Sequence, residues 1–210
     1  MKKVAFITGA SRGIGRATAL AFAQAGYNVA ITAREFDNNT HQQHKITNTS
    51  YAIGSLLDTV KAIESCGSEA LAIRMNLLDP DSIQAAMEQV LTHFGQVDVL
   101  INNAGKGITG PIEDTPTDEM RANFNTNFFG VIDVVKAVLP QMRKQKSGVV
   151  VNVTSIAGYM GLPFRGIYSA SKGALELVTE ALSMEVKNFG IKVINVAPGD
   201  FATNIASGRF

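Results

Sequence analysis

The sequence has one cysteine, a net charge close to zero and no long apolar run, and each scarcity excludes a class of protein. A single cysteine, Cys66, excludes an internal disulfide and favours a reducing compartment, so we expect a cytoplasmic protein. The longest apolar runs have the length of a strand, which predicts that no transmembrane helix is present. The first of them, residues 4–7, is too short for the apolar core of a signal peptide. A formal net charge of +1 gives no electrostatic reason to expect nucleic acid or an anionic membrane as a partner.

The composition is that of a globular protein with one core. Hydrophobic residues make up 46% of the 210 residues and charged residues 18%, and the length suits a single domain, residues 1–210. Apolar runs of strand length alternate with helical patterns, which predicts an α/β fold with a doubly wound parallel sheet. Ligands in such sheets bind beyond the carboxyl ends of the strands. Strands are predicted over residues 4–8, 29–33, 70–73, 97–101, 148–154 and 191–197, and helices over residues 16–25, 55–65, 81–94, 117–144 and 167–188.

A glycine-rich turn joins the first predicted strand to the first predicted helix. Glycines there permit a tight turn and a close approach of the backbone to a phosphate, and the helix N-terminus offers free N–H groups and a partial positive charge. A glycine pattern alone is weak evidence, but its place between strand and helix favours a dinucleotide site. The residues expected to hold the pyrophosphate are Gly9, Ser11, Arg12, Gly13, Ile14 and Gly15.

Arg34 follows the second predicted strand, where dinucleotide-binding units carry the residue that selects the cofactor. An acidic residue at this place accepts the ribose 2′-hydroxyl of NAD, whereas an arginine accommodates the 2′-phosphate of NADP. Arg34, with Arg12 as a second cation, therefore favours NADP over NAD. Glu35 is an unfavourable neighbour for a phosphate, and the alternative interpretation is an arginine that is merely exposed after a strand.

Residues 35–52 are polar and aperiodic, which predicts an inserted surface loop. His41 and His44 within it have a spacing that suits a metal ion, but no third ligand is evident. We therefore expect no bound metal.

Tyr168 and Lys172 form the pattern with the most definite chemical use. The residues after Tyr168 are rich in alanine and leucine, which predicts a helix, and positions four apart lie on one face of a helix. A positive charge beside a phenol favours the phenolate, so we expect Lys172 to lower the pKa of Tyr168 from its ordinary value of about 10. Such a tyrosine can pass a proton to or from an alcohol or a ketone. The alternative is that two common residues merely share a helix.

Asn127 lies within the predicted helix over residues 117–144, whose pattern is interrupted at Phe128, Phe129 and Gly130. A buried asparagine in the middle of a helix needs hydrogen-bond partners. Adjacent backbone groups are the simplest partners, and a role in a functional site is the alternative.

Taken together, the motifs resemble the short-chain dehydrogenase/reductase family across nearly the whole chain and in the family's order. The matching positions are Thr8, Gly9, Gly13, Gly15, Asn102, Asn103, Ala104, Gly105, Asn127, Ser155, Tyr168, Lys172, Pro198, Gly199 and Thr203. The resemblance implies a Rossmann-type fold and a hydride transfer between a nicotinamide cofactor and a CH–OH group. It implies that Tyr168 is the general acid or base, and that Lys172 lowers its pKa and holds the nicotinamide ribose. It further implies that Ser155 hydrogen-bonds the substrate oxygen and that Asn127 supports a water leading protons to Lys172.

The resemblance also implies a set of cofactor contacts beyond the glycine-rich turn. Residues 103–105 are expected beside the adenosine half of the cofactor, and Thr203 beside its carboxamide. Asn76 stands where many members have an aspartate that touches adenine, and an amide can still bond there. The full set of further contacts is Arg34, Asn76, Leu77, Asn103, Ala104, Gly105, Tyr168, Lys172, Pro198, Gly199 and Thr203.

Members of the family typically continue past the position of Thr203 into a segment that covers the substrate, a further helix and a last strand. Here residues 204–210 follow. We therefore expect either a shortened copy or a natural chain that continues, with the last strand and the substrate lid absent from this sequence.

Residues 159–164 are similar to a stretch in hydroxysteroid and retinol dehydrogenases, which favours a bulky, apolar secondary alcohol or ketone as substrate. A 3-oxoacyl-thioester reductase is the nearest alternative. The alternative of another class is a catalytically idle NADP-binding sensor or scaffold, and the intact catalytic positions oppose it.

Self-association is a further expectation. The predicted helix over residues 167–188 carries apolar residues on more than one face. The resemblance points to a homodimer or homotetramer formed through this helix and the one over residues 117–144.

Overall fold

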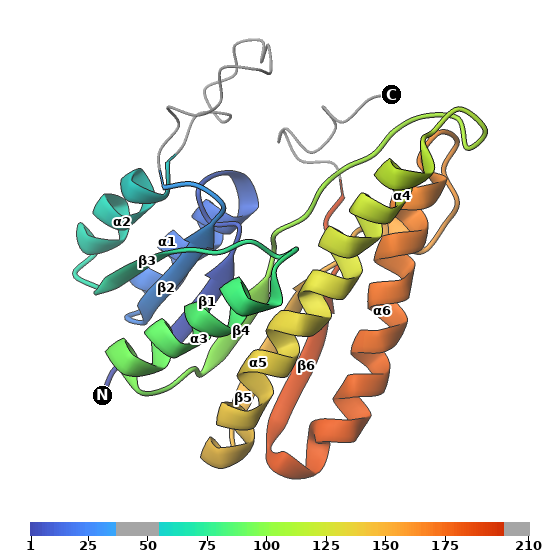
Figure 1. Ribbon diagram of the computed structural model, residues 1–210. Helices are drawn as coiled ribbons and strands as arrows, with labels where there is room; N and C mark the ends of the chain where they lie inside the picture. Colours follow the sequence, from blue (N-terminus) through green and yellow to red (C-terminus); the bar gives the residue numbers. More distant parts are fainter. Residues whose placement is uncertain (37–54, 200–210) are drawn as a thin grey trace.

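A single parallel sheet of six strands organises the protein (Figure 1). The computed structural model describes residues 1–36 and 55–199. The strands lie side by side in the order β3-β2-β1-β4-β5-β6, so the chain starts in the middle of the sheet and winds outward in both directions. The prediction of a doubly wound parallel sheet is therefore confirmed. The strands are β1 (Val4–Thr8), β2 (Asn28–Ala33), β3 (Ala70–Arg74), β4 (Val99–Asn102), β5 (Gly148–Val153) and β6 (Ile191–Val196).

Helices cover both faces of the sheet and divide the core into two layers. One layer lies under α1 (Gly13–Gln24) and α2 (Leu56–Glu64), and the other under α3 (Pro80–Phe94), α5 (Gly130–Gln145) and α6 (Gly166–Val186). Strand β1 shows why both layers are needed, because all five of its residues are buried. Phe6 packs into the second layer and Ile7 into the first, as expected for a central strand with alternating side chains.

Local sequence signals set several helix boundaries. Ser55 and Asp58 form a reciprocal capping box at the start of α2, and the side chain of Asp79 caps α3. Helix α1 begins at Gly13, earlier than the predicted residue 16, because Gly13 takes a positive φ of 57° and turns the chain directly into the helix. Strand β4 begins at Val99, two residues later than predicted.

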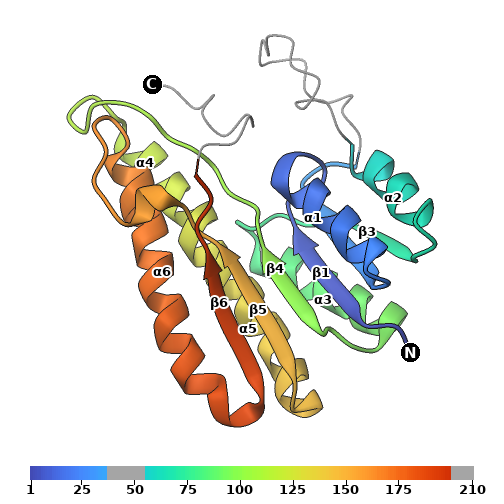
Figure 2. The same ribbon diagram turned by 180° about the vertical axis from the view of Figure 1, so that it is seen from behind.

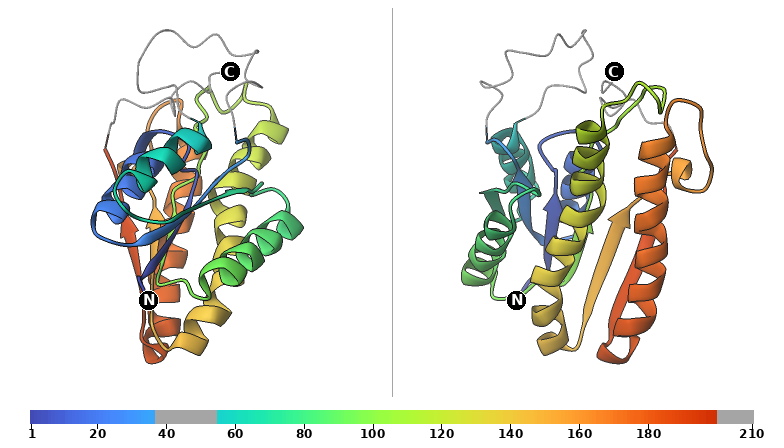
Figure 3. Two further views of the ribbon diagram at one scale, coloured as in Figure 1. Left: turned by 90° about the vertical axis from the view of Figure 1, so that its left-hand side faces the viewer. Right: turned by 45° about the vertical axis from the view of Figure 1, so that its right-hand side comes forward.

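The predicted interruption of the long helix is a π-helical turn, η2 (Asn125–Phe129), between α4 (Thr117–Phe124) and α5. The three segments run on as one rod in the right-hand view of Figure 3. A π-turn widens the helix by one residue without ending it, and such turns are frequent at functional sites. Asn127 lies at its centre.

On the face that α1 and α2 cover, the β5–β6 side of the sheet is open within the described residues (Figure 2). Ile194 and Val196 of β6 are each nearly half exposed there. No helix in residues 1–36 and 55–199 has the length and apolar character needed to cross a membrane. Most of the predicted loop over residues 35–52, with His41 and His44, lies outside the described residues, as does Thr203.

Candidate active site

The predicted site residues gather at the carboxyl ends of β1, β4, β5 and β6, the edge of the sheet at the top of Figure 1. The turn after β1, residues 103–105 after β4, Ser155 after β5 and Pro198 after β6 all lie on this edge. The fold therefore brings four segments that are far apart in the sequence to one side of the sheet.

The turn between β1 and α1 is shaped for the backbone to approach another group closely. Gly9 has a φ of 68°, and a Cβ on it would stand 2.8 Å from the Cα of Ala104. A Cβ on Gly15 would collide with the carbonyl oxygen of Gly9 and the amide of Asn103. The first turn of α1 has no side-chain cap and no acidic residue. Its N–H groups and partial positive charge thus fit the pyrophosphate of a dinucleotide.

Two polar side chains tie this turn to the loop after β4. The hydroxyl oxygen of the buried Thr8 accepts hydrogen bonds from the backbone N–H groups of Asn103 and Ala104, each at 3.0 Å. In return, Nδ2 of Asn103 donates to the carbonyl oxygens of Thr8 and Gly9, also at 3.0 Å. The predicted cofactor-binding residues of these two loops therefore form one rigid unit.

The residues expected on the adenosine side follow β2 and β3. Arg34 is exposed directly after β2. Asn76 is exposed after β3, and its Oδ1 accepts the N–H of Leu78 at 3.1 Å, which leaves its NH₂ group as the donor available to a base. Leu77, by contrast, is buried and packs against Gly130 at the end of the π-turn. Its side chain thus belongs to the core.

Lys172 is buried on α6, one turn after Tyr168, and its Nζ donates to the carbonyl oxygen of Val153 at 2.8 Å. Burial lowers the pKa of Lys172 from 10.5 to about 8. The Nζ lies 3.6 Å from the point where a Cβ on Gly105 would stand, and Oδ1 of Asn127 lies 3.3 Å from the same point. A glycine at residue 105 therefore lets this loop lie close to Asn127 and Lys172, where a larger side chain would press against both.

Tyr168 is also buried, and the direction of its pKa differs from the expectation drawn from its spacing to Lys172. Burial raises the pKa of Tyr168, while a polar contact with the hydroxyl of Ser155 and the charge of Arg165 act in the opposite direction and are outweighed. The groups that oppose the effect of burial do not include Lys172, so the lowering of the Tyr168 pKa that was expected from Lys172 is not seen. Arg165, at the start of α6, is a nearby charge that the sequence analysis missed.

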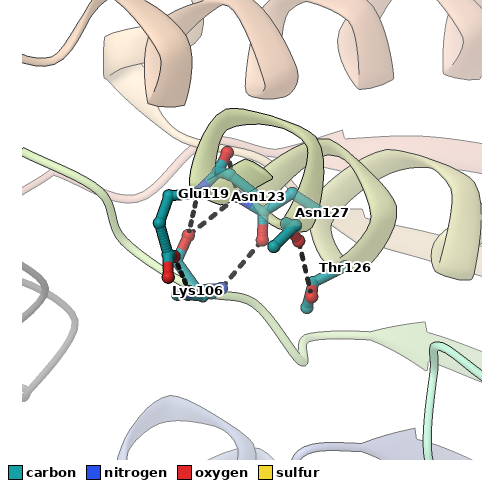
Figure 4. A network of polar contacts seen from close by, with 6 residues as sticks. Lys106, Glu119, Asn123, Thr126 and Asn127 are labelled. Carbon is teal, nitrogen blue, oxygen red and sulfur yellow. Dashed lines mark hydrogen bonds and ion pairs between the residues drawn. The ribbon is translucent and has the colours of Figure 1, made fainter. Parts of the chain in front are cut away.

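Asn127 is fully buried, and both of its side-chain polar atoms bond the backbone of a distant segment at Lys106 (Figure 4). Its Oδ1 accepts the N–H of Lys106 at 2.8 Å, and its Nδ2 donates to the carbonyl of Lys106 at 2.9 Å. The amide also donates to Ser171 of α6, whose hydroxyl bonds the carbonyl oxygen of Tyr168 at 2.8 Å. Asn127 therefore links the loop after β4 to the helix that carries Tyr168 and Lys172.

Asn123 completes this network and was missed by the sequence analysis. It is fully buried one turn before Asn127, donates to the same Lys106 carbonyl at 2.8 Å, and accepts from Nδ2 of Asn127 at 3.2 Å. The spacing of four residues between the two asparagines was a signal that could have indicated a shared face. The side chain of Lys106 forms an ion pair with Glu119 at 2.7 Å in the same region.

Ser155 is held by the short helix η3 (Ile156–Gly158), which packs on α6. A Cβ on Gly158 would stand 3.1 Å from the backbone of Lys172 and Gly173, so the two segments touch backbone to backbone. The N–H of Ile156 donates to the carbonyl of Pro198 at 3.1 Å, which ties the end of β6 to the same turn. These contacts fix the distance between Ser155 and the residues of α6.

Large apolar side chains surround this part of the site. Ile108 is buried against Tyr168. The side chain of Phe164 is exposed. Its backbone has a strained φ of 64°, and its carbonyl oxygen accepts the N–H of Gly110 at 2.8 Å. Four other large apolar side chains are exposed on the same loops: Ile112, Ile156, Tyr159 and Met160. We refer to these five exposed residues as the apolar rim.

The sequence matches the model of a known protein family over nearly its whole length. A family model described as short chain dehydrogenase matches this chain over two overlapping stretches, residues 3–57 and 41–210. The chain belongs to the short-chain dehydrogenase/reductase family. It is therefore an oxidoreductase that acts on CH–OH groups and their carbonyl counterparts.

Two curated members of the family are similar over almost the whole chain. The 3-ketodihydrosphingosine reductase of Bacteroides thetaiotaomicron is 39% identical over 207 residues, which are 99% of this chain and 67% of that protein. The 3-oxoacyl-[acyl-carrier-protein] reductase FabG of Staphylococcus epidermidis is 35% identical over 207 residues, 99% of this chain and 78% of that protein.

Solved structures of the family share the fold. A short-chain dehydrogenase from Streptomyces avermitilis matches with a TM-score of 0.83 and 37% identity, covering 100% of this chain and 70% of that one. An alcohol dehydrogenase from the archaeon Thermococcus sibiricus, complexed with 5-hydroxy-NADP, matches with a TM-score of 0.85 and 28% identity over 100% of this chain and 81% of that one. An NAD⁺-bound xylitol dehydrogenase matches with a TM-score of 0.82 and 31% identity, covering 94% of this chain and 70% of that one. Members of this family thus bind either nucleotide.

Proposed function

We propose that this single dinucleotide-binding domain catalyses the NADP(H)-dependent interconversion of a ketone and a secondary alcohol, with Tyr168 as the general acid or base. The observation that carries the proposal is the placement of Lys172 and Asn127 against Gly105, with Tyr168 one turn before Lys172 on α6 and Ser155 in polar contact with the phenol. The loop that carries Gly105 is tied to the turn expected to bind phosphate, since residues 103 and 104 are bonded to Thr8.

Each side chain has a distinct task in this proposal. The bound nicotinamide supplies or accepts the hydride. Tyr168 donates its phenolic proton to the oxygen of a ketone, or accepts the proton of an alcohol in the reverse direction. The hydroxyl of Ser155 donates a hydrogen bond to the same substrate oxygen and orients the carbonyl. The raised pKa of Tyr168 keeps the phenol protonated at neutral pH, which suits ketone reduction.

Lys172 and Asn127 serve the proton supply. The pKa of Lys172, about 8, lies close to physiological pH, so its ammonium group can release and regain a proton readily. The amide of Asn127 is occupied by both backbone groups of Lys106. Its task is therefore to hold the loop after β4 at the distance from Lys172 that a proton-conducting water requires.

The choice of NADP rests on Arg34 and Arg12. Both are exposed at the carboxyl edge of the sheet, one after β2 and one at the start of α1. A guanidinium group can bind a phosphate with two parallel hydrogen bonds. A thermal-shift comparison of NADP with NAD at equal concentrations tests the choice, because the ligand with the lower Kd gives the larger stabilisation.

The substrate that the site supports best is a bulky apolar ketone, of the kind that hydroxysteroid and retinol dehydrogenases handle. The apolar rim supports this class, since its five large side chains are exposed on residues 103–116 and 155–165, the segment that follows β4 and the one that leads from Ser155 to α6. Exposed apolar side chains that gather on neighbouring loops can mark a binding site, and the N–H of Gly110 joins these two segments by donating to the carbonyl of Phe164. A 3-oxoacyl thioester is the second candidate. The names of the two similar reductases favour it, because both describe reduction of a 3-oxo or 3-keto group.

Oxidation of NADPH by a panel of ketones, followed by absorbance, tests the proposal. We expect turnover with long-chain 3-oxoacyl thioesters or with cyclic apolar ketones, and the Tyr168→Phe variant should lose turnover while it retains NADPH binding. Full activity of Tyr168→Phe would show that another group transfers the proton. Turnover with any ketone excludes a catalytically idle NADP-binding protein.

We further propose that the chain forms a homodimer or homotetramer through α6 and the rod made of α4, η2 and α5. Leu177 and Met184 are 69% and 73% exposed on α6, whereas Leu175 and Val186 of the same helix are buried in the core. An apolar face left in water on a helix favours association. A monomeric mass in solution would contradict this.

A further inference from the structure

Glu35 is the residue of this site that a 2′-phosphate should find repulsive, because it lies next to Arg34. Its carboxylate forms an ion pair with the guanidinium of Arg74, with 3.7 Å between Oε1 of Glu35 and Nη2 of Arg74. The same guanidinium donates a hydrogen bond from Nε to the backbone carbonyl of Arg34 at 3.0 Å. Arg74, the last residue of β3, therefore contacts both members of the Arg34–Glu35 pair.

The backbone around this pair is held from two sides. The N–H of Met75, the residue after Arg74, donates to the carbonyl of Ala33 at 2.9 Å. On the other side, the N–H of Leu56 donates to the carbonyl of Phe36 at 3.1 Å. Residues 33–36 are thus fixed between β3 and the start of α2, so the side chains of Arg34 and Glu35 are presented by a rigid frame.

We propose that Arg74 is a positioning residue for cofactor selection, which acts by pairing with Glu35 and so keeps the carboxylate from opposing the phosphate bound by Arg34. An unpaired carboxylate at this place has two effects in the same direction. It repels a phosphate, and it accepts a hydrogen bond from a ribose 2′-hydroxyl. Loss of Arg74 therefore shifts selectivity from NADPH toward NADH. The inference rests on the proposed use of NADP.

A double-mutant cycle on Arg74 and Glu35 tests the pairing. The dissociation constants of NADPH and NADH are measured by fluorescence titration at low ionic strength for the wild type, Arg74→Ala, Glu35→Gln and the double variant. Both side chains are exposed, 68% for Arg74 and 40% for Glu35, so the fold should tolerate the changes. An exposed charge pair is worth up to about 1 kcal/mol, which is about fivefold in an affinity ratio. We therefore expect Arg74→Ala to lower the preference for NADPH over NADH about fivefold.

The Glu35→Gln background separates an indirect role of Arg74 from a direct one. There, Arg74→Ala should change the preference less than twofold, because no carboxylate remains to be neutralised. Arg74→Lys, which keeps the charge and loses the Nε geometry, should retain most of the wild-type preference. Salt at about 1 M should reduce the effect of Arg74→Ala, since exposed charges are screened.

An equal change in both backgrounds would overturn the inference, because Arg74 would then act on the phosphate directly. If the Arg74→Ala variant keeps the NADPH preference of the wild type, the inference is also overturned. The proposed function would stand in that case. A wild type that binds NADH as tightly as NADPH would contradict the proposed cofactor as well.

Discussion

Replacement of Lys172 by methionine should make the protein more stable and inactive. In the folded protein the pKa of Lys172 falls from 10.5 to about 8, which corresponds to about 3 kcal/mol in favour of the neutral amine. At pH 7 the group is protonated, so the folded state bears that cost of a buried charge. Methionine has a similar length and removes it. The variant loses the hydrogen bond to the carbonyl of Val153, worth about 1 kcal/mol, which leaves a net gain of about 2 kcal/mol.

The pH dependence of the free energy of unfolding is a second and more specific test of the buried charge. Between pH 8 and pH 10.5 the unfolded chain binds more protons at Lys172 than the folded chain does, so this group makes the free energy of unfolding rise with pH. The rise should reach about 2 kcal/mol by pH 9.5. Because other groups also titrate there, the quantity to compare is the difference between the wild type and Lys172→Met, which should shrink by that amount.

Urea denaturation at pH 7.0 and pH 9.5 measures both effects, and Lys144→Met on the exposed side of α5 serves as the control. The control should change stability by less than 0.5 kcal/mol at either pH, as is usual for surface substitutions. If Lys172→Met is less stable than the wild type, or if the difference between them is the same at the two pH values, the lysine is not buried as a charge and the reasoning fails.

Three further changes have defined outcomes. Asn123→Ala should destabilise the fold by about 2 kcal/mol in urea denaturation, because it leaves buried polar atoms of Asn127 and Lys106 with fewer partners, and should lower kcat more than it raises KM. Phe164→Gly should raise the free energy of unfolding by about 1 kcal/mol, since its φ of 64° suits glycine, yet raise KM for an apolar ketone several-fold; equal loss for a small ketone would contradict a role in binding. Gly158→Ala should lower kcat and stability by moving Ser155 away from α6, whereas Gly161→Ala in the same loop, with open space around it, should leave both unchanged.

Periodicity predicted the fold well, because the strands of a parallel sheet are buried on both faces and therefore stand out as apolar runs. The five residues of β1 are an example, since no solvent-facing position interrupts them. The π-turn was predicted only as an interruption at Phe128, Phe129 and Gly130, because one extra residue in a turn shifts the apolar residues that follow to another face. The pattern shows that shift but not that the helix continues through it.

What the sequence could not predict depends on contacts between distant segments. Asn127 was expected to bond adjacent backbone if it had no functional role, and it bonds Lys106 instead. The pairing of Glu35 with Arg74 joins the ends of two neighbouring strands. The direction of the Tyr168 pKa depends on burial, which is a property of the folded chain. Spacing indicated which residues meet, but not which of their interactions dominates.

The partner of Lys172 explains how a buried lysine can serve a proton relay. A carboxylate at 2.8 Å would stabilise the ammonium form and hold its pKa high, so the proton would leave only slowly at neutral pH. The carbonyl of Val153 satisfies one N–H group and adds no formal charge, so desolvation dominates and the pKa stays at about 8. The same choice leaves the charge uncompensated, which is why the site costs stability. The loss of stability at Lys172 and its readiness to exchange a proton near physiological pH therefore have one physical cause.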